Sequence, residues 1–155
     1  MSRAAVICCG NPSRGDDALG HLVFDRLGNA SGEFDAFCDY QLQIEHVFDM
    51  HERECVIFVD AAVDIADPFE MREIFPRRDA SHSTHALPPE ALLAVYEKVM
   101  KRIAPQAYLL SVKGESFGLG EPLSVNAQKN LDAAWIFLQN FMELKSDLGK
   151  AAIPG

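Results

Sequence analysis

Residues 4–20, AAVICCGNPSRGDDALG, decide the fold, because they combine a buried strand, a glycine-bounded loop and the start of a helix. The apolar run AAVICC is typical of a parallel strand that is covered on both faces. The next residues, GNPSRG, end this strand, and apolar residues at helical spacing follow from Ala18 to Gly28. Asp16 and Asp17 are therefore expected where the first strand passes into the first helix.

This acidic pair argues against a phosphate-binding loop. Residues 10–15 have the outline of such a loop, but a nucleotide-binding motif would continue with Lys and Ser or Thr, and here Asp16 and Asp17 follow. Their two negative charges would repel a phosphate. One aspartate can cap the helix and complement its dipole, but a cap needs only one carboxylate, so the second is a candidate for function.

Length and charge limit the class of protein. The 155 residues fit one domain, which we place at residues 1–145, with a flexible tail at 146–155 where periodicity ends. The formal net charge of −9 argues against nucleic acid and anionic membranes as partners. With no apolar run long enough to span a membrane and no signal-peptide pattern, the sequence predicts a cytoplasmic protein.

The four cysteines contain no CxxC pair, which argues against a zinc knuckle or a thioredoxin-type site. They lie in or near apolar segments, at positions 8, 9, 38 and 55. Because free cysteine is among the most buried residue types, we expect all four to be reduced core residues.

Strand and helix patterns alternate along the chain. Strands are predicted at residues 4–9, 33–39, 55–59, 69–75 and 107–112, and helices at 18–28, 41–50, 88–102 and from 124 onward. This order predicts an α/β protein: a single three-layer domain with a mostly parallel twisted sheet and helices on both faces.

Three side chains are expected to meet at one edge of this sheet. Asp17 follows the first strand, Asp60 ends a central strand, and His85 lies in a loop before a helix. In parallel sheets the binding crevice lies outside the carboxyl ends of the strands. Two carboxylates and one imidazole suit nickel, zinc or cadmium and leave positions open for substrate or water. On spacing alone, a structural role for these three residues is as well supported as a metal-binding or catalytic role.

Several separated motifs together resemble the hydrogenase maturation endopeptidases, which trim the C-terminus of the large subunit of nickel–iron hydrogenase after nickel insertion. These motifs are GNPSRGDDALG at 10–20, YQLQIEHVFDM at 40–50, CVIFVDAA at 55–62, STHALPPEALL at 83–93 and GESFGLGEPLS at 114–124. They occur in the expected order and cover most of the chain.

The resemblance implies a metal-dependent, aspartic-type endopeptidase whose metal-recognising and catalytic residues are Asp17, Asp60 and His85. The nickel belongs to the large-subunit precursor, the expected partner, and other divalent ions are expected to fit the same residues. Which carboxylate is ligand and which is general base stays open. Many members carry Glu where this chain has Asp17, and Ala18 replaces a common Gly.

Two alternatives use the same residues. A receiver-type signalling domain would bind magnesium, take a phosphoryl group on Asp60 and use Lys113, although the GNPSRG insertion and the position of His85 count against it. A nickel carrier would bind the metal without hydrolysis. Cys9 and Ser83 lack the context of an activated nucleophile.

Three further residues are weaker candidates for supporting roles. Asn11 and Asp16 are expected to shape the loop, and His82 is expected to contact the metal-recognising residues from outside.

Overall fold

A five-stranded sheet forms the centre of the molecule, which is described by a computed structural model over residues 2–30, 32–78 and 87–152. The strands are β1 (Ala4–Cys9), β2 (Phe34–Asp39), β3 (Cys55–Ala62), β4 (Phe69–Ile74) and β5 (Gln106–Lys113). They lie in the order β2-β1-β3-β5-β4. All neighbours are parallel except β4, which runs antiparallel to β5. The predicted mostly parallel sheet is therefore confirmed.

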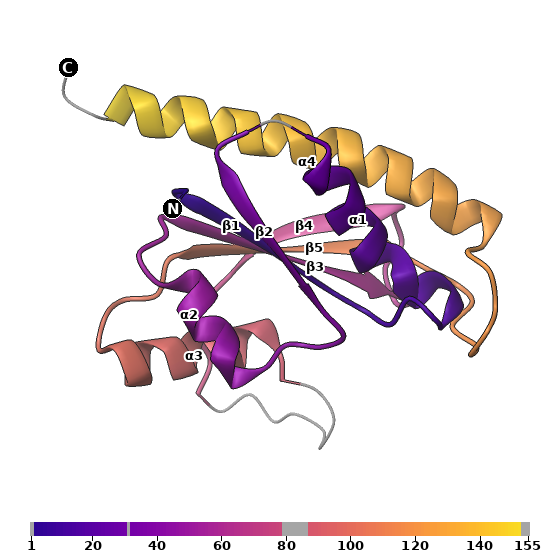
Figure 1. Cartoon of the computed structure of the whole chain (residues 1–155), viewed down its shortest axis with the longest axis horizontal. Helices are drawn as coiled ribbons and strands as arrows, with labels where there is room; N and C mark the ends of the chain where they lie inside the picture. Colours follow the sequence, from indigo (N-terminus) through magenta and orange to yellow (C-terminus); the bar gives the residue numbers. More distant parts are fainter. Residues whose placement is uncertain (1, 31, 79–86, 153–155) are drawn as a thin grey trace.

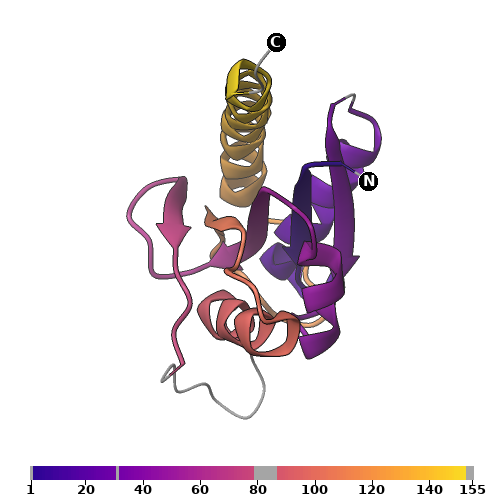
Figure 2. The same ribbon diagram turned by 90° about the vertical axis from the view of Figure 1, so that its left-hand side faces the viewer.

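Helices cover both faces of this sheet. They are α1 (Leu19–Gly28), α2 (Val47–Met50), α3 (Pro89–Met100) and α4 (Val125–Ala152), with 3-10 turns η1 (Gly15–Ala18) and η2 (Ile44–His46) before α1 and α2. In Figure 1, α1 and α4 lie on one side of the strands and α2 and α3 on the other. The turned view in Figure 2 shows α4 and α3 separated by the sheet, which confirms the three layers.

Each face of the sheet has its own hydrophobic core. Alternate residues of β1 separate to the two faces, as the pleat requires: Val6 and Cys8 pack under α1 and α4, while Ala5 and Ile7 pack under α2 and α3. A strand buried on both faces needs a continuous apolar sequence, and AAVICC supplies one.

The cysteines occupy the core, as predicted. All four are free thiols; Cys8, Cys9 and Cys55 are buried, and Cys38 is half-buried. Burial, with smaller contributions from Cys38 and Cys9, raises the pKa of Cys8 well above its ordinary value. The same effect of burial raises the pKa of Cys38 and of Cys55 to about 11.

Residues 41–50 correct a prediction. The expected helix is only the η2 turn followed by the four residues of α2. Helical spacing would place Ile44 and Phe48 on one buried face with Val47, but both are exposed, and His46 is buried instead. A segment of one or two turns does not present a continuous stripe, so apolar residues at helical spacing did not identify its buried side.

The last helix is longer than the strands that it covers. Its 28 residues span about 42 Å at 1.5 Å per residue, whereas strands of six to eight residues span about 20–26 Å. Helix α4 therefore extends past the amino ends of the strands (Figure 1). It includes residues 146–152, part of the segment for which the sequence predicted a flexible tail. Among the described residues, no helix is long and apolar enough to cross a bilayer.

Candidate functional site

Three strand ends place acidic and thiol side chains in one row at the carboxyl edge of the sheet. Asp39 at the end of β2 pairs with Cys9 at the end of β1. On the other side of β1, Cys8 pairs with Val59, so Asp60 follows at the same level on β3. Parallel strands thus bring together residues that are far apart in the sequence.

Asp17 is brought back to this row by the turn after β1. Gly10 has a φ of +150°, and a Cβ there would lie 2.1 Å from the carbonyl oxygen of Asp17, so the η1 turn rests directly on the end of the strand. The Asn11 backbone N–H donates to Oδ2 of Asp17 at 2.8 Å. This bond gives Asn11 the loop-shaping role that the sequence suggested and fixes the half-buried Asp17 carboxylate.

The Asp60 carboxylate is affected by burial and by Asp17. Asp60 was expected to end its strand, but β3 continues for two more residues to Ala62. Part of the Asp60 side chain reaches solvent, while the neighbouring strands surround the rest of it. The resulting desolvation, together with the negative charge of Asp17, raises the pKa of Asp60 to about 7, and a bond of 2.8 Å from the Ala61 N–H opposes this rise. Asp17 and Asp60 therefore lie close enough for their charges to interact.

Asp16 has a different role from its neighbour. It is fully buried, and its carboxylate accepts hydrogen bonds from the backbone N–H groups of Glu115, Ser116 and Ser124 and from the Ser124 hydroxyl, at 2.7–3.1 Å. Burial acts to raise the pKa of Asp16, but these bonds outweigh it and lower the pKa below its ordinary value. Asp16 therefore holds the loop before α4 against the loop before α1.

Two glycines allow these close approaches. Gly15 has a φ of +52°, and a Cβ there would lie 2.4 Å from the carbonyl oxygen of Ser116. A Cβ on Gly20 would lie 2.1 Å from the carbonyl oxygen of Cys9, so the first turn of α1 packs against the end of β1. The two glycines thus fix where the acidic turn stands relative to the sheet.

The Cys9 thiol is not suited to be a nucleophile. Its exposed fraction is 6%. Burial, followed by the charge of Asp60 and smaller contributions from neighbouring groups, raises the pKa of Cys9 to about 12. Because the thiolate is the reactive form, this thiol is inert at neutral pH, in agreement with the sequence-based interpretation.

Sequence reasoning gave Asp39 no role, although its carboxylate lies next to a buried histidine, His46. The Gln43 N–H donates to Nδ1 of His46 at 2.8 Å, so in the neutral ring Nε2 carries the proton, and it lies 3.7 Å from Oδ2 of Asp39. His46 is thus a buried imidazole with a neighbour at each ring nitrogen. The available signal for Asp39 was its position, since it ends its strand as Asp60 ends the apolar run of β3.

The third predicted ligand cannot be placed. His85 lies outside the described residues, together with His82 and Ser83. Within residues 2–30, 32–78 and 87–152, no group of three His, Cys, Asp or Glu side chains is arranged to hold a metal. The structure thus brings Asp17 and Asp60 together, and the participation of His85 stays a prediction.

Comparison with known proteins finds relatives by structure and not by sequence. No protein-family model matches the chain, and no curated protein matches it either. Solved structures do match. The hydrogenase maturating endopeptidase HybD from Escherichia coli has a TM-score of 0.75 at 18% identity, covering 92% of this chain and 93% of that one.

Two further solved structures match over similar lengths. The hydrogenase maturation protease HycI from Thermococcus kodakarensis has a TM-score of 0.70 at 21% identity, covering 92% of this chain and 93% of its own. The endopeptidase HycI from Escherichia coli has a TM-score of 0.69 at 20% identity, covering 91% of both chains. The chain therefore has the fold of the hydrogenase maturation proteases, the fold that its motifs implied.

Proposed function

We propose that the protein is an endopeptidase that removes the C-terminal extension of a nickel–iron hydrogenase large-subunit precursor after nickel insertion. In this proposal Asp17, Asp60 and His85 recognise the nickel, which the precursor carries as part of the substrate. The observation that carries the proposal is the meeting of Asp17 and Asp60 at the carboxyl edge of a sheet with the maturation-protease fold.

The two carboxylates suit a cation that arrives with its substrate. Two negative charges in one site repel each other, and this repulsion contributes to the raised pKa of Asp60. A divalent cation between the two carboxylates relieves that repulsion and displaces the proton. Without a cation the repulsion between the two carboxylates remains. The site should therefore bind a precursor that already holds its metal more tightly than one that does not.

The proposed cleavage can be carried out by a divalent ion together with the Asp17 and Asp60 carboxylates. A divalent ion polarises a carbonyl or lowers the pKa of a bound water, which prepares a peptide bond for hydrolysis. A carboxylate with a pKa of about 7 can accept a proton at neutral pH, so Asp60 is suited to be the general base in any step where it is not bound to the cation. Asp16 takes no part in this chemistry, because its oxygens are fully engaged by the loop before α4.

Incubation with a nickel-loaded large-subunit precursor tests the proposal. The readout is loss of the C-terminal extension, followed by mass spectrometry. We expect Asp17→Asn, Asp60→Asn and His85→Ala each to lower the cleavage rate by about a hundredfold or more, because removing a metal-recognising group removes transition-state stabilisation. The matched control is Asp64→Asn, which removes one exposed acid from the turn after β3 and should leave the rate unchanged.

Two controls separate hydrolysis from other activities. The same precursor without nickel should remain uncut, and equal cleavage of both forms would contradict metal recognition. Acetyl phosphate should not label Asp60, because the sheet order with an antiparallel β4 differs from the parallel order 2-1-3-4-5 of receiver-like folds. Labelling would favour the receiver alternative, and nickel uptake without cleavage would favour the carrier.

A further inference from the structure

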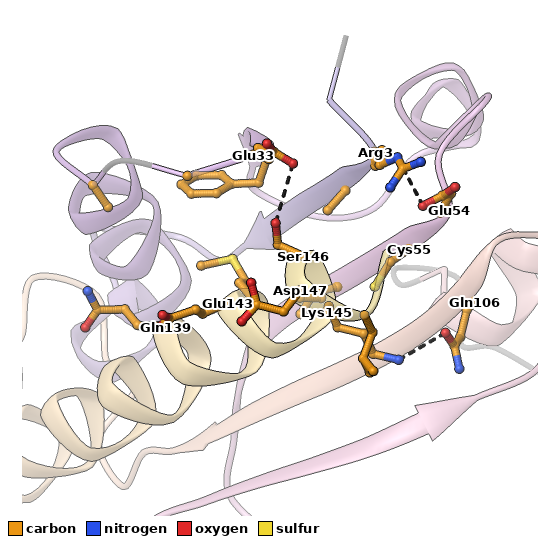
Figure 3. A pocket seen from close by; sticks show the side chains of 17 residues that line it. Arg3, Glu33, Glu54, Cys55, Gln106, Gln139, Glu143, Lys145, Ser146 and Asp147 are labelled. Carbon is orange, nitrogen blue, oxygen red and sulfur yellow. Dashed lines mark hydrogen bonds and ion pairs between the residues drawn. The ribbon is translucent and has the colours of Figure 1, made fainter. Parts of the chain in front are cut away.

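A second site lies at the opposite edge of the sheet, and it goes beyond the proposed peptidase activity. A cavity of about 780 Å³ opens beside the amino ends of the strands, beneath the C-terminal part of α4 (Figure 3). This volume falls in the range of small-molecule sites, roughly 300–1,000 Å³. We propose that the cavity binds a small organic cation with an apolar body.

The cavity exists because the two helices on this face differ in length. Helix α1 ends at Gly28, whereas α4 continues to Ala152 and extends over the amino ends of the strands. Among the residues that the structure describes, no helix fills the space beyond α1. Three of the residues that line it are small: Ala4, Ala30 and Gly32. The gap is thus built into the way this layer is covered.

The inner lining is suited to an apolar body. Phe34 from β2, Ile57 from β3 and Met142 from α4 all line the cavity. Phe34 and Met142 also pack on the core beneath α4, so their positions are fixed by the fold rather than by a ligand. A hydrocarbon or aromatic group that covers these side chains would be removed from water, which favours binding in proportion to the apolar area covered.

Both cations of the lining are already engaged. Nε of Arg3 lies 3.5 Å from Oε2 of Glu54. Nζ of Lys145 donates to Oε1 of Gln106 at 3.1 Å and lies 4.9 Å from the centre of the Tyr108 ring. Figure 3 shows the pair of Arg3 with Glu54 and the pair of Lys145 with Gln106 on the walls of the cavity. Neither cation is therefore placed to hold an anionic ligand without giving up a contact.

Two carboxylates supply the complementary charge. Glu143 and Asp147 lie one turn apart on α4, and both line the cavity (Figure 3). Neither forms a hydrogen bond or an ion pair with another residue in the ranges 2–30, 32–78 and 87–148, where side chains are described. Like charges four residues apart on a helix repel each other, and a cation between them would relieve this repulsion. An apolar lining beside this acidic pair specifies a ligand that is both apolar and positively charged.

Two probes with the same tail and opposite charge test this specificity. Decylammonium and decanoate are titrated into the ¹⁵N-labelled full-length protein below their micelle concentrations, and backbone amide shifts are followed by NMR. We expect decylammonium to bind saturably with one site per chain, with shifts centred on Ala4, Phe34 and Ile57. Decanoate should bind at least tenfold more weakly, because its charge is repelled by the acidic pair.

A matched pair of variants tests the two carboxylates. The double substitution Glu143→Gln with Asp147→Asn keeps the shape of the cavity and should weaken decylammonium binding about tenfold, while leaving decanoate unchanged or improved. The control Asp64→Asn with Asp67→Asn changes the net charge equally at an exposed turn on the far edge and should leave both affinities unchanged.

Three results would overturn the proposal. The first is equal affinity for the two probes. The second is an equal loss of affinity in both double variants, which would mean that net charge alone attracts the amine. The third is a set of shifts centred on the exposed apolar residues Tyr40, Ile44 and Phe48 instead of the cavity. None of these results depends on cleavage, so the peptidase proposal stands or fails separately.

Discussion

The two edges of the sheet are built in opposite ways. At the carboxyl edge, Asp16 is fully buried and all its bonds go to the loop before α4, while Gly20 brings α1 against the end of β1. At the amino edge, α1 and α4 part and leave a cavity of about 780 Å³. Two of the charged groups there form contacts on its walls: Arg3 with Glu54, and Lys145 with Gln106.

The carboxyl edge holds its side chains in fixed positions, whereas the amino edge leaves a cavity between its side chains. Buried polar contacts with fixed directions hold the acidic turn, and with it Asp17, at a defined place on the sheet. The wall of the cavity is held less firmly, because its ion pair of Arg3 with Glu54 is largely exposed. Substitutions should therefore cost much more stability at the carboxyl edge than at the cavity.

The largest effect is expected at Asp16. Asp16→Asn retains the shape of the side chain, but the amide cannot accept all the bonds donated by Glu115, Ser116 and Ser124, so buried donors lose their partner. We expect the free energy of unfolding to fall by about 3–5 kcal/mol, measured by urea denaturation.

Asp17→Asn is the matched control, with an expected loss below about 1 kcal/mol because only one bond to Asn11 is affected. Equal losses at the two positions would contradict the separation of roles. The pKa of Asp16 is lowered by folding, so its contribution is complete above the unfolded-state value of about 3.9 and is lost as the pH falls through the lower folded-state value. The difference between wild type and Asp16→Asn should therefore narrow below about pH 4.

The next effect is expected at Gly20. A methyl group there would lie 2.1 Å from the carbonyl oxygen of Cys9, so Gly20→Ala must push α1 away from the strand. We expect a loss of about 2–4 kcal/mol in thermal or urea unfolding. In the same helix, a Cβ on Gly28 meets no atom within 4 Å, and Gly28→Ala should be neutral or stabilise by up to about 1 kcal/mol. Equal losses of stability at the two glycines would contradict the close packing of α1 against Cys9 at Gly20.

A smaller effect concerns the titration of Asp60. Its carboxyl ¹³C signal should titrate with a midpoint at about pH 7. Because the folded-state pKa lies above the unfolded value of about 3.9, the folded state holds more protons between the two, and stability should fall as the pH rises through this interval. Asp60→Asn should remove that fall.

Substitution of the neighbouring carboxylates checks the cause. Asp17→Asn should lower the midpoint of Asp60, because it removes the charge that helps to raise the pKa. Asp39→Asn should leave the midpoint nearly unchanged, since Asp39 does not contribute to this rise. If Asp17→Asn left the titration midpoint of Asp60 unchanged, the two carboxylates would not share a site.

The smallest effect is expected at the wall of the cavity. Arg3→Gln breaks the pair with Glu54, whose side chains are 42% and 62% exposed respectively. Exposed ion pairs contribute little, so the free energy of unfolding should change by less than about 0.5 kcal/mol. A loss comparable to that of Gly20→Ala, measured in the same urea series, would contradict the contrast between the two edges.

Local sequence patterns were enough to predict the order of strands and helices and the edge at which Asp17 and Asp60 meet. Both follow from the apolar runs that end at Cys9 and Val59 and from the rule that parallel strands share an edge. The antiparallel direction of β4 could not be predicted, because a strand of six residues reads the same whichever way it pairs.

The role of Asp16 was also hidden from local patterns. The sequence suggested that it shapes the loop, but its bonding partners are 99–108 residues away in the chain. Likewise, the burial of His46 depends on a short turn whose direction is set by packing and not by periodicity.

The bond between Asp16 and Ser124 also limits how early the acidic turn can fold during synthesis of the chain. The two residues are 108 positions apart, and ribosomes add roughly 5–20 residues per second, so the aspartate waits for roughly 5–20 s before its partner is made. Until then the acidic turn has no anchor on its far side. A nascent chain stalled before residue 115 should therefore hold the first strands without the ordered turn that the last quarter of the protein provides.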